Sequence, residues 1–203
     1  MIQFHLSKVL SIDMKMHIAA PLAINPGAMQ WYGHRVTIMR RKCVLMMELQ
    51  SRYCMIFTGM TKPDFEDFPE RFIDRMWREV VSICQLDDDQ SEMLAELVLA
   101  VAQDQCFQAG HDRSVQAHIK QVVEEIEQAI HYRTGRLPVS DEEMFGLGVR
   151  VNERIRKRKG DKDYFVPLEV FRDFWLGMLE FAPVSEEPEE DELPDNVVPF
   201  KRP

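Results

Sequence analysis

The sequence predicts an α+β protein: a small N-terminal antiparallel β-meander packed against about five α-helices, with a disordered acidic C-terminal tail. Residues 1–60 contain the short β-branched, aromatic and apolar runs that are typical of strands. From residue 63 the apolar residues recur every three or four positions, as in amphipathic helices. We therefore expect one domain over residues 1–182, with strands in 1–60 and helices in 63–182, and a separate tail over 183–203.

Three strand-like runs follow one another at hairpin spacing, over residues 36–39, 43–49 and 53–57. Cationic or polar triplets separate them, which predicts a three-stranded antiparallel meander, and residues 1–6 are a possible fourth strand. Every position from 43 to 47 is apolar, so we expect both faces of that strand to be covered. If the tip of the second hairpin lies at 50–51, Cys54 faces Met47 rather than Cys43. The path of residues 20–30, which contain two prolines and a glycine, does not follow from the sequence.

Capping residues divide the remainder of the domain into five predicted helices. The first carries an apolar stripe from Phe65 to Val81, with Pro69 suited to a first turn. The second, third and fourth helices each start at an acidic residue or a serine and end at a glycine. Their starts are Asp89, Asp112 and Ser140, and their ends are Gly110, Gly135 and Gly160. The fifth helix starts at Pro167.

The charge balance argues against a generally cationic surface. The 203 residues include 25 Lys and Arg against 34 Asp and Glu, a formal charge of −9. Residues 183–203 hold seven acids, two bases and five prolines, so the tail carries −5 and the body −4. Such a segment has too little apolar surface to offset its ordering entropy, which is why we expect it to be disordered.

The composition also bears on the compartment. The chain shows no cationic leader followed by an apolar run, and the longest apolar stretch, 97–102, is far shorter than a membrane span. The four cysteines form no CxxC pair. We therefore expect a cytoplasmic protein with reduced, mostly buried thiols and no membrane contact.

No catalytic or metal-binding motif is present. The six histidines lack helical ligand spacing, and there is no G-x-S-x-G elbow, S-x-x-K motif or P-loop. Gly146 and Gly148 form only a G-x-G fragment inside a predicted helix. We expect no metal and no cofactor, and whether the protein is an enzyme stays open.

A first cationic cluster follows the first long strand. Arg40, Arg41 and Lys42 occupy a tight connection, with Arg35 and Arg52 nearby in sequence. Guanidinium groups match phosphate oxygens, so a phosphate site is one interpretation, and a solvated turn that discourages edge pairing is the other. Trp31 is either a stacking platform beside this cluster or a core residue.

A second cationic cluster is denser than helix capping requires. Its binding candidates are Arg154, Lys157 and Arg158, within a run that also includes Arg150, Arg156, Lys159 and Lys162. The acidic tail could neutralise this cluster and compete with an external anion. On that hypothesis, removing residues 183–203 raises affinity for a polyanion such as heparin or DNA.

Several sequence islands resemble a family of small, uncharacterised bacterial proteins, a domain of unknown function. The likeness covers about residues 1–180, and members differ from this chain over 116–120. The resemblance implies a mixed α/β fold and no known activity, cofactor or substrate. It also draws attention to Arg113 as a binding candidate. The matching islands are Met1-Ile2-Gln3-Phe4, Trp31, Val36-Thr37-Ile38, Arg40-Arg41-Lys42-Cys43-Val44-Leu45 and Asp112-Arg113-Ser114-Val115.

These observations favour a non-enzymatic protein that acts by surface recognition. We expect a protein partner first and a nucleic acid or other polyanion, bound through the basic clusters, second. The alternative is a small hydrolase or transferase whose site is assembled from distant loops near Trp31 and Arg40–Lys42. The oligomeric state does not follow from the sequence.

Overall fold

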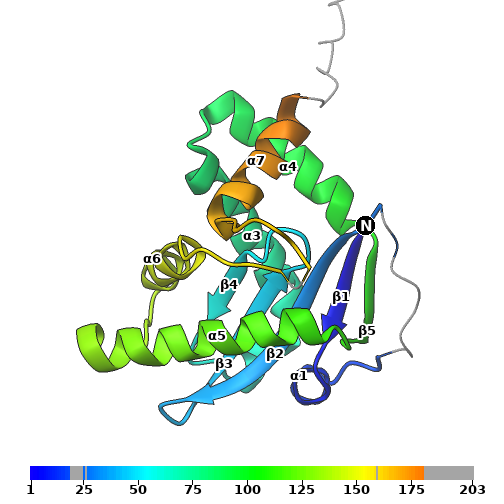
Figure 1. Ribbon diagram of the computed structural model, residues 1–203. Coiled ribbons are helices and arrows are strands. Elements are labelled where there is room, and N and C mark those ends of the chain that lie inside the picture. The colour runs from blue at the N-terminus through cyan, green and yellow to red at the C-terminus, as the bar shows by residue number, and fades with distance from the viewer. Residues whose placement is uncertain (19–24, 26, 159, 181–203) are drawn as a thin grey trace, which may run out of the picture.

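The protein folds around a five-stranded mixed β-sheet with helices on both faces (Figure 1). The computed structural model describes residues 1–18, 25, 27–158 and 160–180. The strands lie in the order β4-β3-β2-β1-β5 and span Ile2–Leu6 (β1), Met29–Ile38 (β2), Arg41–Glu48 (β3), Cys54–Phe57 (β4) and Gln105–Ala109 (β5). The helices of the described chain are α1 (Lys8–Asp13), α2 (Lys62–Glu66), α3 (Phe68–Cys84), α4 (Asp88–Ala102), α5 (Arg113–Ala129), a π-helical turn η1 (Ile130–Thr134), α6 (Asp141–Asn152) and α7 (Pro167–Glu180). The predicted α+β class is confirmed.

Strands β2, β3 and β4 form the predicted antiparallel meander. The predicted pairing of Met47 with Cys54 is confirmed, and Cys43 pairs with Val36 instead. Strand β3 is buried on both sides because its side chains alternate between two apolar clusters: Val44 and Met46 point to one and Leu45 to the other.

The expectation of a purely antiparallel meander was wrong, because β1 pairs in parallel with both β2 and β5. Strand β5 occupies residues that we assigned to a helix ending at Gly110. That helix, α4, ends at Ala102, and the chain then returns along the edge of the sheet so that the ring of Phe107 stacks on Phe4 with 5.0 Å between centroids. Parallel pairing requires a long crossover, and local periodicity carries no signal for it.

Most predicted helix starts are confirmed by their caps. The carboxylate of Asp112 accepts hydrogen bonds from the backbone at the start of α5, and Ser140 Oγ does the same for α6. Pro167 opens α7. The predicted first helix is two helices, α2 and α3, which meet at Asp67. The helix beginning at Ser140 ends at Asn152, well before the predicted Gly160.

Two apolar layers enclose the sheet. On one face, α3 packs Phe72, Met76 and other side chains against β1 and β2, with α4 and α7 beyond it. On the opposite face, α5 packs onto β2 and β3, and α6 lies beside the edge strand β4 (Figure 1). Each large apolar side chain buried in these layers stabilises the fold by about 1.5–3 kcal/mol relative to exposure.

Some sequence predictions fall outside the described residues, namely the acidic tail over 183–203 and most of the segment 20–30. In the part of the chain that the structure describes, no helix is both long and apolar enough to cross a bilayer. All four cysteines are free, with Cys43 and Cys54 buried and Cys84 and Cys106 half-buried.

Candidate functional site

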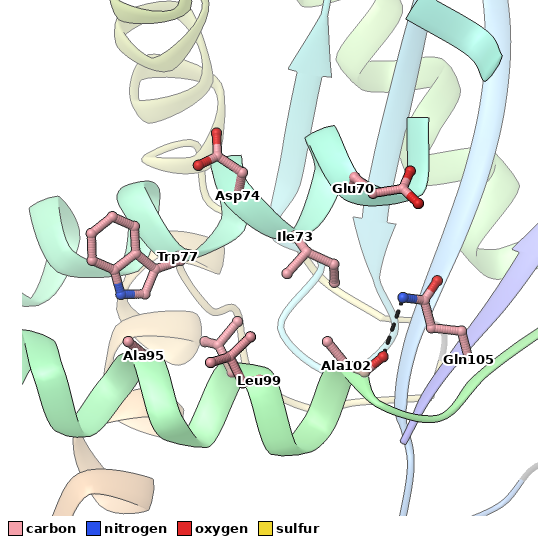
Figure 2. A pocket seen from close by; sticks show the side chains of 9 residues that line it. Glu70, Ile73, Asp74, Trp77, Ala95, Leu99, Ala102 and Gln105 are labelled. Carbon is pink, nitrogen blue, oxygen red and sulfur yellow. Dashed lines mark hydrogen bonds between the residues drawn. The ribbon is translucent and has the colours of Figure 1, made fainter. Parts of the chain in front are cut away.

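A groove lies between α3 and α4 on the outer side of the helical layer. Its volume is about 530 Å³. In Figure 2 the side chains of Ile73 and Trp77 point from α3 toward α4, whereas the carboxylate of Asp74 points away from it. Each helix contributes residues at helical spacing of i, i+3, i+4 and i+7, so each wall is one continuous stripe: Glu70, Ile73, Asp74 and Trp77 from α3, and Ala95, Val98, Leu99 and Ala102 from α4.

Helix α4 explains why this groove is apolar. From residue 93 to 102 it is apolar at every position except Glu96, so its apolar surface extends beyond the core-facing side to Leu99 and Ala100, which are exposed beside Glu96. Leu94 and Val98 are buried against the core, and Val101 faces a cavity shared with α7. Leu99 is left 63% exposed in the groove. The apolar surface of α4 is thus covered on its core-facing side, whereas Leu99 on the outer side is not covered.

The surroundings of the groove are acidic. Glu70 is exposed on the α3 wall, and Asp74 forms an ion pair with Arg78 at 3.0 Å. Between residues 86 and 110 the sequence contains six acids and no Lys or Arg. The groove therefore combines an apolar floor with acidic surroundings, which come from Glu70 and the α4 segment because Asp74 is neutralised by Arg78.

The first predicted cationic cluster is split by the fold. Arg40 and Arg41 are exposed in the β2–β3 turn, whereas Arg35 and Lys42 both contact Asp13, at 2.9 and 2.8 Å. Burial raises the pKa of Asp13, but the hydrogen bonds from Lys42 and Arg35 outweigh it and hold that pKa below its usual value. Two of these cations thus anchor α1 to the sheet.

Trp31 lies apart from that turn. It is fully buried and makes edge contacts with the rings of Phe72 and Phe171. It pairs with Glu48 at one end of β2, while the cationic turn follows the other end, about 23 Å away at 3.3 Å per strand residue. The structure therefore does not bring Trp31 and the Arg40–Lys42 turn together.

The second predicted cationic cluster is only partly a free surface. Arg154 and Lys157 are exposed, but Arg156 is buried and forms an ion pair with Glu125 at 2.9 Å. Arg158 donates to the backbone carbonyl of Gln50 and lies 4.5 Å above the ring of Phe165. Much of this cluster therefore fastens the segment after α6 to α5 and to the β3–β4 turn.

That fastening produces a buried polar cluster that the sequence did not reveal. Arg52, in the β3–β4 turn, donates to Ser114 Oγ in the first turn of α5 at 3.4 Å. His118, one turn farther along α5, bonds the backbone carbonyl of Lys157 at 3.2 Å. Arg113 is exposed beside them at the start of the helix. The available sequence signal was the Asp112–Ser114 island. It supplies the N-cap of α5, Asp112, and the hydroxyl of Ser114 that accepts a hydrogen bond from buried Arg52.

The thiols are poor candidates for nucleophilic chemistry. Burial raises the pKa values of Cys43 and Cys54, and it raises the pKa of Cys84 to about 11, so these groups are protonated near neutral pH. In the described segments, no three His, Cys, Asp or Glu side chains gather in a way that could hold a metal ion.

Comparison with known proteins identifies a family and no characterised relative. The model of a family described as "Domain of unknown function (DUF6933)" matches residues 3–170. No curated protein and no solved structure matches the chain. The match spans both apolar layers and reaches into α7, which confirms the resemblance carried by the strand block and the Asp112–Val115 island. The chain belongs to this family, the domain of unknown function DUF6933.

Proposed function

We propose that this protein is a non-enzymatic recognition protein, and that it binds a partner protein by seating a basic amphipathic helix of that partner in the α3–α4 groove. The single observation that carries the proposal is Leu99 of α4, which is 63% exposed in the apolar groove that α3 and α4 line. A third helix would bury Leu99 and complete the covering of α4.

The shape of the groove supports a helix as the occupant. Its two walls are helical stripes, and a helix laid between two helices packs its own apolar stripe into the groove they form. Trp77 offers a large surface on one wall, and its indole Nε1 is covered and has no hydrogen-bond partner among the described residues. Tryptophan in such a position often contributes most of the binding energy of an interface.

The charge around the groove selects the kind of helix. Acidic residues on both helices favour a partner with Lys or Arg flanking its apolar stripe. The same acids repel nucleic-acid phosphates and anionic lipid surfaces. A basic protein segment therefore fits this groove better than a nucleic acid or an anionic membrane does.

The location proposed with this function is a bacterial cytoplasm. The four free cysteines support it, since such thiols persist in a reducing compartment. Recognition of a polyanion through the basic clusters, and the alternative of a hydrolase or transferase site near Trp31 and Arg40–Lys42, stay predictions. The masking of the second cluster by residues 183–203 also stays a prediction.

Binding can be tested with Trp77 as the reporter. The full chain would be titrated with a synthetic helical peptide of Leu and Lys, and with a matched peptide in which Glu replaces Lys. We expect tryptophan emission to shift to shorter wavelength with the Lys peptide only. The Trp77→Phe variant should lose most of that shift, because Trp31 and Trp175 are fully buried.

Position 99 separates groove binding from general electrostatic attraction. Leu99→Lys should weaken the Lys peptide about tenfold or more, since it places a charge on the apolar floor. Ile155→Lys is the matched control, because Ile155 is 67% exposed and lies outside the groove, and it should leave binding unchanged. Equal weakening by both variants, equal binding of the Glu peptide, or a Leu99-dependent dimer in sedimentation would each contradict the proposal.

A further inference from the structure

Arg52 is a buried cation whose hydrogen-bonding capacity is largely unused. Its side chain is 4% exposed, and the bond from Nη2 to Ser114 Oγ is long, at 3.4 Å. Its Nε and Nη1 atoms are covered and have no acceptor among the described residues. A buried guanidinium without a paired anion is costly, because it has lost its hydration and gained little in return.

Other unused polar atoms gather around it. Tyr32 is 2% exposed and His118 is 6% exposed, and neither Tyr32 Oη nor His118 Nδ1 has a partner within the described chain. The Nε of Arg158 is also covered and has no hydrogen-bond partner among the described residues. The hydrogen bonds of His118 to the carbonyl of Lys157 and of Arg158 to the carbonyl of Gln50 bring these groups to the β3–β4 turn, and Tyr32 shares a core cluster with Val115 of α5. Burial raises the pKa of Tyr32 and lowers that of His118.

The acids nearby are engaged elsewhere. The carboxylate of Asp112 caps α5 by accepting from the backbone N–H of Ser114 and of Val115, at 2.7 and 3.1 Å. Glu48 uses its carboxylate on the backbone N–H groups and the hydroxyl of the β3–β4 turn. Burial lowers the pKa of Arg52, and the fields of Asp112 and Glu48 oppose that effect without a hydrogen bond between either carboxylate and the guanidinium. Arg158 pairs with Asp161 through Nη1 at 3.4 Å, which leaves its Nε unused.

We propose that Arg52, Tyr32, His118 and Arg158, at the first turn of α5, form a binding site for a phosphate-class oxyanion. Arginine forks and hydroxyl donors suit tetrahedral oxyanions, and the N-terminal end of the 17-residue helix α5 adds a favourable field. Ser114 and Arg158 are only half-buried, so the cluster reaches solvent at its outer end. This proposal is independent of the α3–α4 groove.

His118 makes the site selective between oxyanions. Its Nε2 bonds a carbonyl oxygen, which only accepts, so Nε2 carries the ring proton and Nδ1 of the neutral ring is an acceptor. Burial and the Arg52 charge lower the pKa of His118 and favour that neutral ring. Hydrogen phosphate keeps a proton near neutral pH and can donate it to Nδ1, whereas sulfate has none to donate. Phosphate should therefore bind more tightly than sulfate.

Calorimetric titration of the full chain with inorganic phosphate, at an ionic strength held constant with sodium chloride, tests the site. Arg52→Gln should weaken binding about tenfold or more, because it removes charge-assisted hydrogen bonds. Arg40→Gln is a matched control: both arginines follow a strand in a hairpin turn with positive φ, 62° for Arg40 and 61° for Arg52, but Arg40 is exposed. Equal weakening by both variants, or no phosphate binding to the wild type, would overturn the proposal.

Tyr32→Phe distinguishes binding from a structural role and is not expected to prevent folding. It removes one covered hydroxyl without a partner and keeps the ring that stacks on His5 at 4.2 Å. We expect an unchanged or higher melting temperature without phosphate and phosphate binding about threefold to tenfold weaker. Unchanged affinity in this variant would contradict the assigned donor.

Titrations with sulfate and with adenosine monophosphate identify the form of the ligand. Phosphate stronger than the monoester indicates the free anion, and the reverse indicates a phosphate group on a larger molecule; both agree with the site if Arg52→Gln weakens them. Sulfate binding as tightly as phosphate would contradict the role of His118.

Discussion

Replacing Asn152 should detach the outer strand of the sheet from α6. Asn152 is fully buried at the last position of α6. Its Oδ1 accepts from Cys54 N at 2.8 Å, and its Nδ2 donates to Cys54 O and to Gly148 O, both at 2.9 Å. Because β4 is an edge strand, this one amide stands where a further strand would pair with Cys54.

The expected cost follows from those three bonds. Asn152→Ala removes them at about 1 kcal/mol each and leaves a buried N–H and C=O of Cys54 without partners, so we expect about 3 kcal/mol or more of lost stability. Asn152→Asp keeps one acceptor but turns a carboxylate toward two carbonyl oxygens. The pKa of the new acid should therefore be raised in the folded state, and the loss should grow as pH rises above about 4.

Urea unfolding followed by tryptophan emission measures both effects. Glu153→Ala is the control, because Glu153 is the exposed neighbour that caps the same helix end only through its backbone. A loss below about 1 kcal/mol for Asn152→Ala would refute the reasoning. So would an Asn152→Asp variant whose stability is independent of pH between about 4 and 8.

Two further predictions concern the sheet. Burial lowers the pKa of His5, so the unfolded chain binds more protons below about pH 6.5, and stability should fall as pH drops from 7 to 5. His5→Phe, which keeps a ring against Tyr32, should flatten that slope in melting temperature, whereas the same change at exposed His131 should not. A Cβ on Gly33 would lie within 2.9 Å of three core side chains, so Gly33→Ala should destabilise by about 1–3 kcal/mol in urea unfolding. Gly146→Ala meets nothing within 4 Å in α6 and should be neutral or stabilising.

Features set by neighbouring residues could be predicted from the sequence. The Met47–Cys54 register followed from a turn of defined length, and the starts of α5 and α6 followed from Asp112 and Ser140. The covering of β3 on both faces followed from its unbroken apolar run. In each case the residues that stabilise the feature lie within a few positions of the sequence pattern that predicts it.

Features set by distant residues could not be predicted. Strand β5 contains glutamines at 105 and 108 and resembles a weak helix end, and it becomes a strand because β1 offers a free edge. The helix breaks between α2 and α3 at Asp67, although the apolar stripe from Phe65 to Phe72 continues across the break and predicts one helix. Tertiary pairing decided both cases.

The same distinction applies to the sites. The apolar run 97–102 was visible in the sequence, but its exposure at Leu99 depends on how α3 and α7 lie beside it. Arg52 looked like one more turn cation, and only its burial against Ser114 sets it apart from Arg40. An exposed apolar side chain and a buried charged one are the features that point to a site, and both depend on the fold rather than on the local sequence.

Because β1 lies between β2 and β5, completion of the sheet depends on a segment that is synthesised much later than β1. Its residue His5 contacts Gln108 across 103 positions, so β1 is synthesised long before its second neighbour, β5, exists. Until then the growing chain presents β1 with one unpaired edge, and deletion of β1 would remove the strand with which β5 pairs.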